Sequence, residues 1–154
     1  MRFAADRMLG RLARWLRVIG QDVVYGSHLS GTALVQTARR EGRIILTRDT
    51  RLVRRHGLPP HLFVTSDHFR EQLRQVVSAF DLSSPAAIMT RCIDCNEELR
   101  EADRSLVRHR VPPYVWATQG RFMTCCRCRR VFWGATHTEH MRAELTRLGI
   151  TVPC

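Results

Sequence analysis

The first 82 residues alternate between short apolar runs and longer amphipathic segments. Short apolar runs bounded by polar residues are typical of buried strands, and apolar residues three or four positions apart are typical of helices packed on a sheet. This alternation predicts an α/β fold: a parallel sheet with right-handed crossovers and helices on both faces. We expect strands at residues 2–5, 22–25, 43–47 and 62–65, and helices at residues 8–19, 30–41, 51–55 and 69–80.

The pattern changes after residue 82. Residues 81–85 (DLSSP) are typical of a linker, and the remainder of the chain holds two cysteine pairs followed by a last amphipathic segment. Thr136 and Glu139 form a capping-box pattern at the start of that segment, which predicts a C-terminal helix. We therefore expect two units: an α/β unit over residues 1–82, and a zinc ribbon with the C-terminal helix over residues 83–154.

Charge narrows the choice of partner. The chain of 154 residues is 44% hydrophobic and carries a formal net charge of +11, and all 25 of its basic residues are arginine. Such a balance predicts a polyanionic partner, either nucleic acid or an anionic membrane surface. Arginine suits bidentate phosphate contacts, although codon bias in a GC-rich genome is an alternative reason for the missing lysines. No apolar run reaches membrane-spanning length and no signal segment opens the chain, so we expect a cytoplasmic protein that does not enter membranes.

All six cysteines lie in the last 63 positions. Clustering of this kind favours a local metal site over a disulfide framework. Two C-x-x-C pairs can supply four thiolates to one tetrahedral ion, and a closed site of four thiolates is structural zinc rather than catalytic zinc. We expect Cys126 and Cys154 to be free, and the zinc ligands to be Cys92, Cys95, Cys125 and Cys128.

Three aspartates, Asp6, Asp49 and Asp67, each follow an apolar run and precede a helical pattern. The carboxyl ends of parallel strands meet at one edge of a sheet, so the three carboxylates converge there if their strands are neighbours. Carboxylates ~4 Å apart repel by roughly 4 kcal/mol at an effective dielectric constant of 20, and a cation offsets this repulsion. The sequence thus predicts a Mg²⁺ or Mn²⁺ site that activates water against a phosphodiester. The alternative is that the three acids only cap helices.

Four arginines recur along the first helical segment at i, i+4, i+7 and i+10, with no acid in the stripe. Like charges at such spacing repel one another, which favours a surface that binds phosphates over an ordinary solvated face. A solvated face remains the alternative. The candidate phosphate-binding residues are Arg7, Arg11, Arg14 and Arg17 of this stripe, with Arg48 beside Asp49.

Several motifs together resemble the Mut-seven C-terminal ribonuclease domain, a PIN-like fold followed by a zinc ribbon. The resemblance runs to about residue 145. It is carried by the cysteine pairs and by residues 6–17 (DRMLGRLARWLR), 45–52 (ILTRDTRL), 111–115 (VPPYV) and 131–137 (VFWGATH).

The resemblance implies a PIN-type sheet in which the first, third and fourth strands are adjacent, and metal-dependent cleavage of RNA. Asp6 and Asp49 match motif positions of the family, whereas Asp67 matches by context only. One acid that PIN-type sites usually contain near the start of the second helix is missing, because residues 29–33 (LSGTA) hold no carboxylate.

We therefore expect a ribonuclease that uses Mg²⁺ or Mn²⁺, with RNA as its partner. Because this acid is missing, the main alternative is a non-catalytic protein that binds RNA or the ribosome through the same fold. A nuclease restrained by a partner protein, as in toxin systems, is a further alternative, and charge alone does not separate RNA from DNA.

Overall fold

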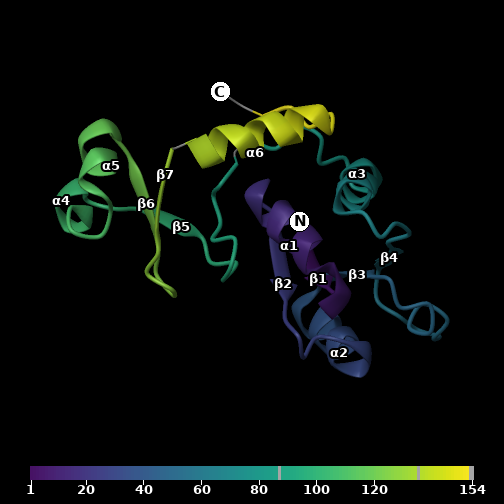
Figure 1. Ribbon diagram of the computed structural model, residues 1–154. Helices are drawn as coiled ribbons and strands as arrows, with labels where there is room; N and C mark the ends of the chain where they lie inside the picture. The colour runs from purple at the N-terminus through teal and green to yellow at the C-terminus, as the bar shows by residue number, and fades with distance from the viewer. Residues whose placement is uncertain (87, 135, 153–154) are drawn as a thin grey trace.

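A four-stranded parallel sheet forms the centre of the computed structural model, which describes residues 1–86, 88–134 and 136–152 (Figure 1). The strand order is β2-β1-β3-β4. Phe3 of β1 is in register with Val23 of β2 and Ile44 of β3, and Leu46 of β3 is in register with Leu62 of β4. The predicted α/β fold is confirmed. The strands are β1 (Arg2–Ala5), β2 (Asp22–Tyr25), β3 (Ile44–Thr47) and β4 (His61–Phe63).

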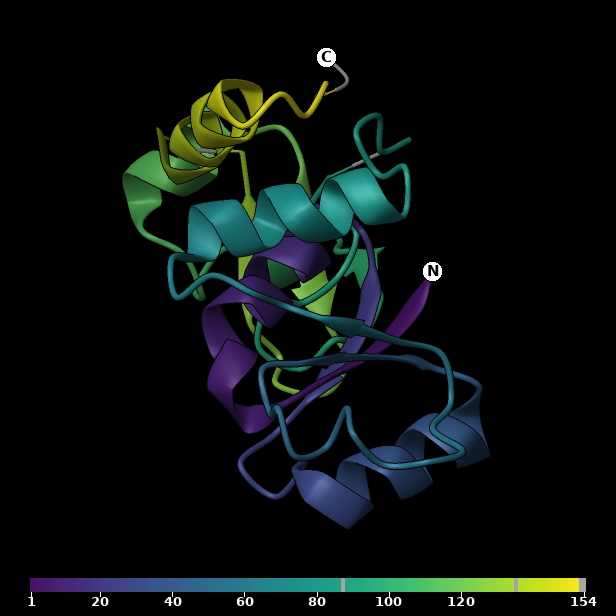
Figure 2. The same cartoon turned by 90° about the vertical axis from the view of Figure 1, so that its right-hand side faces the viewer.

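Helices cover both faces of this sheet, as Figure 2 shows. Successive side chains of a strand point to opposite faces, so Phe3 packs with α1 and α3 while its neighbour Ala4 packs with α2. Leu46 and Ile45 of β3 divide in the same way. The helices are the 3-10 turn η1 (Arg7–Leu9), α1 (Gly10–Val18), α2 (Gly31–Glu41) and α3 (Phe69–Ala79).

The structure differs from the prediction between β3 and β4. The helix expected at residues 51–55 is a series of turns, in which Val53 N–H donates to the Asp49 carbonyl and Arg55 N–H to the Leu52 carbonyl. Gly57 and the Pro59-Pro60 pair follow within a few residues and would end a helix there. The segment is therefore too short for a stable helix. It remains a loop at the edge of the sheet.

A smaller antiparallel sheet, with strand order β5-β6-β7, forms the ribbon. Its own apolar cluster contains Val107, Val111 and Phe122. Pro112 and Pro113 open the last short helix before β6, where proline is tolerated because the first helical amides have no intrahelical partner. The elements are β5 (Leu99–Glu101), α4 (Arg104–Val107), α5 (Pro113–Thr118), β6 (Phe122–Cys125) and β7 (Val131–Trp133).

The last helix, α6 (Thr136–Arg147), leaves the ribbon and crosses to the α/β unit (Figure 1). Met141, Leu145 and Leu148 belong to the same buried cluster as Phe3 and Leu73. We expected this helix to belong with the ribbon in a unit of residues 83–154. That division stays a prediction, and the structure adds that the helix also packs on the core of the α/β unit. The apolar stripe of α6 completes the cluster that α1 and α3 form on one face of the sheet, and α6 lies on the outer side of these two helices (Figure 2).

A buried arginine joins the two sheets. Arg17 is 3% exposed. Its Nε and Nη2 donate to the Val23 carbonyl at 3.0 and 2.8 Å, and its Nη1 donates to the carbonyls of Ile93 and Asp94 at 2.8 and 2.9 Å. The loop that begins the ribbon is thereby held against β2, the edge strand. The expectation that Arg17 lies in an exposed, phosphate-binding stripe is therefore wrong, since every donor atom of its guanidinium is used inside the protein.

We predict that Arg17→Met lowers the free energy of unfolding by about 2–4 kcal/mol, because it leaves several buried carbonyls without a donor. Arg14→Met is the matched control: Arg14 is on the same helix, and its exposed ion pair with Asp94 contributes less than about 1 kcal/mol. Urea unfolding of both zinc-loaded variants measures the difference. Equal stabilities for the two variants would contradict the assigned role of Arg17.

Candidate active site and metal centre

The four predicted zinc ligands lie together. The sulfur atoms of Cys92, Cys95, Cys125 and Cys128 are all within 4.8 Å of one another, and the Sγ atoms of Cys92 and Cys128 are 3.7 Å apart. A tetrahedral site with Zn–S bonds of about 2.3 Å requires S···S separations of about 3.8 Å. The four sulfur atoms therefore fit one zinc ion.

Each cysteine pair is followed by a residue with a left-handed backbone: Asn96 (φ 68°) after Cys95 and Arg129 (φ 60°) after Cys128. The amides of Asn96 and Arg129 donate back to the carbonyls of the first cysteine of each pair, both at 2.9 Å. Two identical turns thus present the four thiols to one point. Asn96 also accepts a hydrogen bond from the Val23 amide at 2.9 Å, which fixes the first turn to β2.

The crowded thiols do not ionise alike. Burial raises the pKa of Cys92, and burial together with hydrogen bonds that the Cys95 thiol donates to the other sulfur atoms raises the pKa of Cys95 to about 12. Burial acts in the same direction on Cys128, but hydrogen bonds from the Arg130 backbone and the other thiols outweigh it and lower its pKa to about 7. Without a cation the cluster therefore holds mostly protonated thiols, and metal binding releases those protons. Cys126 is exposed and outside the cluster, and Cys154 lies outside the described residues.

Asp6 and Asp49 meet at the carboxyl edge of the parallel sheet. Asp6 is 2% exposed and follows β1, whereas Asp49 is half-buried and follows β3. Thr47 lies between them: its hydroxyl donates to Asp6 Oδ2 at 2.7 Å and accepts from the Asp49 amide at 3.0 Å. Asp49 Oδ1 in turn accepts from the amides of Arg51 and Leu52. These bonds fix both carboxylates and leave Oδ2 of Asp49 without a partner in the described chain.

Both carboxylates line one cavity of about 440 Å³, which the start of α2 closes on one side. Ser30 and Gly31 contribute this wall, at the position where a further acid was expected by resemblance to PIN-type sites. The wall therefore adds no carboxylate. The rest of the cavity is basic, because Arg7, Arg48 and Arg51 also line it.

Asp67 lies outside this cavity. Its side chain is 76% exposed, forms an ion pair with Arg48, and lines a neighbouring cavity together with Arg11 and Phe69. Arg48 therefore separates Asp67 from the Asp6–Asp49 pair. Across residues 1–86, 88–134 and 136–152, the four cysteines are the only set of three or more metal-ligating side chains close enough for one ion.

The remaining predicted arginines are on the surface of α1 and η1. Arg7, Arg11 and Arg14 are exposed. Arg11 lies over the ring of Phe69, 3.8 Å from its centroid, and Arg14 donates to Asp94 at 2.9 Å. Three of the four residues of the predicted stripe are thus placed where they can reach a ligand.

Sequence reasoning missed Thr47. The available signal was a polar residue that ends an otherwise aliphatic strand two positions before an acid. In the structure Thr47 is fully buried and holds both carboxylates in place.

We predict one zinc ion per chain, and that Cys95→Ser removes it. A structural zinc site contributes about 10–16 kcal/mol in small zinc domains, so the variant loses the ribbon fold over residues 90–134. Because Arg17 and Asn96 bind the same loop to β2, the melting temperature of the α/β unit falls as well. Elemental analysis and hydrogen exchange measure both effects. Cys126→Ser is the control and keeps its zinc; a zinc-free wild type would refute the assignment.

The comparisons with known proteins agree with this geometry. The family model described as Mut7-C RNAse domain matches residues 1–145, which span the parallel sheet, the acid pair and all four clustered cysteines. Searches of curated proteins and of solved structures gave no match. In the described part of the chain, no helix is both long and apolar enough to span a membrane. The chain therefore belongs to the Mut7-C RNAse domain family, whose description indicates a ribonuclease with RNA as its substrate.

Proposed function

We propose that this protein hydrolyses RNA phosphodiester bonds in the cavity lined by Asp6 and Asp49, with Mg²⁺ or Mn²⁺ as the cofactor. The observation that carries the proposal is the pair of carboxylates held by one buried threonine, facing a cavity that is otherwise basic. A structural cap alone does not need a second, immobilised carboxylate beside it. The arrangement instead matches what a divalent cation and an anionic substrate require together.

The residues present fit a hard cation. Asp6 and Asp49 would hold it, and when bound it would lower the pKa of water and neutralise charge on the phosphate. Mg²⁺ is usually held by one or two carboxylates together with water and substrate phosphate, so the absence of an acid at Ser30 and Gly31 does not prevent binding. The Thr47 hydroxyl donates to Asp6 Oδ2 and so fixes the orientation of that carboxylate toward the cavity.

Arg48 is the residue that we assign to the phosphate beside the cut. It lines the cavity, and its buried Nε has no hydrogen-bond partner among the described residues. Its ion pair with Asp67 orients the guanidinium from the other side. We therefore assign Asp67 to positioning Arg48, in place of the direct metal contact expected from the sequence.

One observation favours a second candidate, an RNA- or ribosome-binding protein without catalysis. The cavity contains two carboxylates, and the expected third acid is engaged by Arg48. Two carboxylates bind a cation more weakly than three, and a basic cavity binds RNA without any cation. The experiment below separates the two candidates.

We predict that Asp49→Asn reduces RNA cleavage at least ~100-fold, because it removes charge that a cation needs while asparagine still caps the following turn. Asp6→Asn has the same effect. Asp67→Asn lowers cleavage less and raises KM, since it acts through Arg48. The assay uses zinc-loaded protein and a mixed RNA pool with Mg²⁺, with Mn²⁺ and without either, and melting temperatures confirm that each variant folds.

Cleavage by Asp49→Asn and Asp6→Asn at the wild-type rate would place the active site elsewhere. Binding of RNA by the wild type, with no cleavage in any of these conditions, would establish the non-catalytic candidate.

We also predict that replacing Arg11 and Arg14 by glutamine weakens RNA binding. Each phosphate contact to a single strand adds about 0.7 to the slope of log K against log salt, so two lost contacts flatten it by about 1.4. The matched control replaces Arg39 and Arg40 of α2, which are exposed and on the opposite face of the sheet. A salt titration with one short RNA measures both variants; equal slopes would remove α1 from the binding surface.

A further inference from the structure

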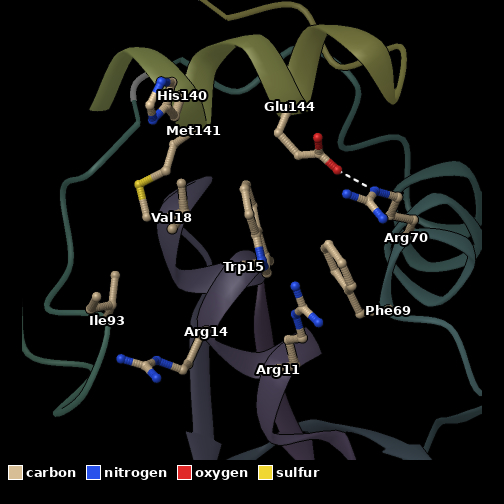
Figure 3. A pocket seen from close by; sticks show the side chains of 10 residues that line it. All are labelled: Arg11, Arg14, Trp15, Val18, Phe69, Arg70, Ile93, His140, Met141 and Glu144. Atoms are coloured by element: carbon tan, nitrogen blue, oxygen red, sulfur yellow. Dashed lines mark hydrogen bonds and ion pairs between the residues drawn. The ribbon is translucent and has the colours of Figure 1, made fainter. Parts of the chain in front are cut away.

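A second cavity, of about 450 Å³, lies between α1, α3 and α6 (Figure 3). Its centre is aromatic: Trp15 of α1 and Phe69 of α3 are stacked, with ring centroids 5.8 Å apart and planes inclined by 22°. Met141 of α6 lies on the other side of Trp15 in Figure 3. The arrival of α6 on the α/β unit thus creates this cavity, which we call the Trp15 pocket.

Arginines border the Trp15 pocket. Arg11 and Arg70 both lie over the Phe69 ring, 3.8 and 5.0 Å from its centroid, so Phe69 is 9% exposed while Trp15 remains half-buried. Trp15 is therefore the aromatic surface that the pocket leaves open. A pocket of this kind offers an apolar plane together with positive charge at its rim.

Among the described residues that line the pocket, the one acid is already paired with arginine. Glu144 forms ion pairs with Arg70 and with Arg147, and the hydrogen bond from Arg70 lowers the pKa of its carboxyl group. At the opposite rim, Arg11 forms no ion pair with a described residue, and Arg14 shares the single carboxylate of Asp94 with Arg130. Both arginines therefore add positive charge to the pocket. The net charge around the pocket is positive, which favours an anionic ligand.

Shared residues connect the Trp15 pocket to the acid pair. Met8 lines both the Asp6–Asp49 cavity and the neighbouring cavity that contains Asp67. Arg11, Phe69 and Arg70 line both that neighbouring cavity and the Trp15 pocket. Three cavities therefore follow one another along η1 and α1. Helical rises of 2.0 and 1.5 Å per residue place Trp15 roughly 15 Å from Asp6 along this path.

We propose that the Trp15 pocket binds an unpaired base of the RNA whose backbone passes through the Asp6–Asp49 cavity. This inference rests on the proposed function only in taking RNA as the ligand, and it holds whether or not the RNA is cut. The base stacks on Trp15, and Arg11 and Arg14 contact the adjoining phosphates. Stacking requires an unstacked base, so the favoured substrate is single-stranded RNA or RNA with a single-stranded end.

A protein partner fits the same features less well. A protein segment would need acidic residues spaced to meet Arg11 and Arg14 as well as an apolar group for Trp15. Every RNA nucleotide carries both a flat base, which can stack on Trp15, and a phosphate, which can pair with Arg11 or Arg14. Binding of RNA without any contribution from the pocket is the outcome that would favour a protein occupant.

The first test varies the ligand and leaves the protein intact. Zinc-loaded wild type without added Mg²⁺ or Mn²⁺ is titrated with a short single-stranded RNA, with the same sugar–phosphate chain lacking its bases, and with a blunt duplex. The single strand should bind at least about fivefold more tightly than the abasic chain, because stacking of a base on an aromatic side chain has that effect or a larger one. Equal affinity of the two chains would overturn the proposal.

The second test assigns the preference to Trp15. Trp15→Phe keeps a flat aromatic face and should retain most of the preference for bases, whereas Trp15→Leu should lose it. In both variants the salt slope should stay unchanged, because the arginines remain. An unchanged base preference in Trp15→Leu would overturn the assignment.

Photo-crosslinking of wild-type protein to RNA that contains 4-thiouridine needs no variant. Crosslinks should fall on the peptides of α1, α3 and α6 that line the pocket, and crosslinks confined to the ribbon would overturn the proposal. These readouts measure binding only. Base-dependent binding without cleavage would therefore refute the nuclease and leave the pocket standing, and cleavage without base dependence would do the reverse.

Discussion

The guanidinium of Arg17 is the contact on which the arrangement of the two sheets depends. It donates in one direction to β2 of the parallel sheet and in the other to the loop that carries the first two cysteines of the cluster. Desolvating a guanidinium costs free energy that only complete hydrogen bonding offsets, so the contact tolerates little displacement of either side. The ribbon is therefore fixed to the edge strand, and α6 can leave it in the direction that returns to the core.

That return adds a third feature beside the two that the α/β unit already contains. The acid pair is at the carboxyl edge of β1 and β3, the exposed arginines are on η1 and α1, and the Trp15 pocket is between α1, α3 and α6. The parallel sheet alone supplies the acid pair. The pocket exists only because α6, which follows the ribbon in the chain, packs against α1. The four-cysteine ribbon therefore affects this pocket through the position of α6, although it contributes few of the lining side chains.

The local features of this molecule were predictable from sequence, and the features made by distant segments were not. The aliphatic run at Ile44–Leu46 predicts a buried strand with an acid at its end, and the cysteine spacing predicts the metal centre; both signals act over a few residues. Arg17 has the same helical spacing as its exposed neighbours, so its burial depends on carbonyls 76 and 77 positions away. The partner of Asp67 and the packing of α6 depend in the same way on contacts that no local pattern encodes.

The packing of α6 also has a consequence for the order in which the chain can fold. Phe3 in the first strand and Ile150 beyond the last helix belong to one buried cluster, and the Thr151 amide donates to the Ser83 carbonyl. During synthesis, the part of this cluster that α6 covers stays open until that helix has left the ribosome. Domains generally fold from the amino-terminal side as they emerge, and transiently exposed apolar surface favours aggregation. The apolar core of the α/β unit must therefore stay incompletely covered while the whole ribbon is being synthesised.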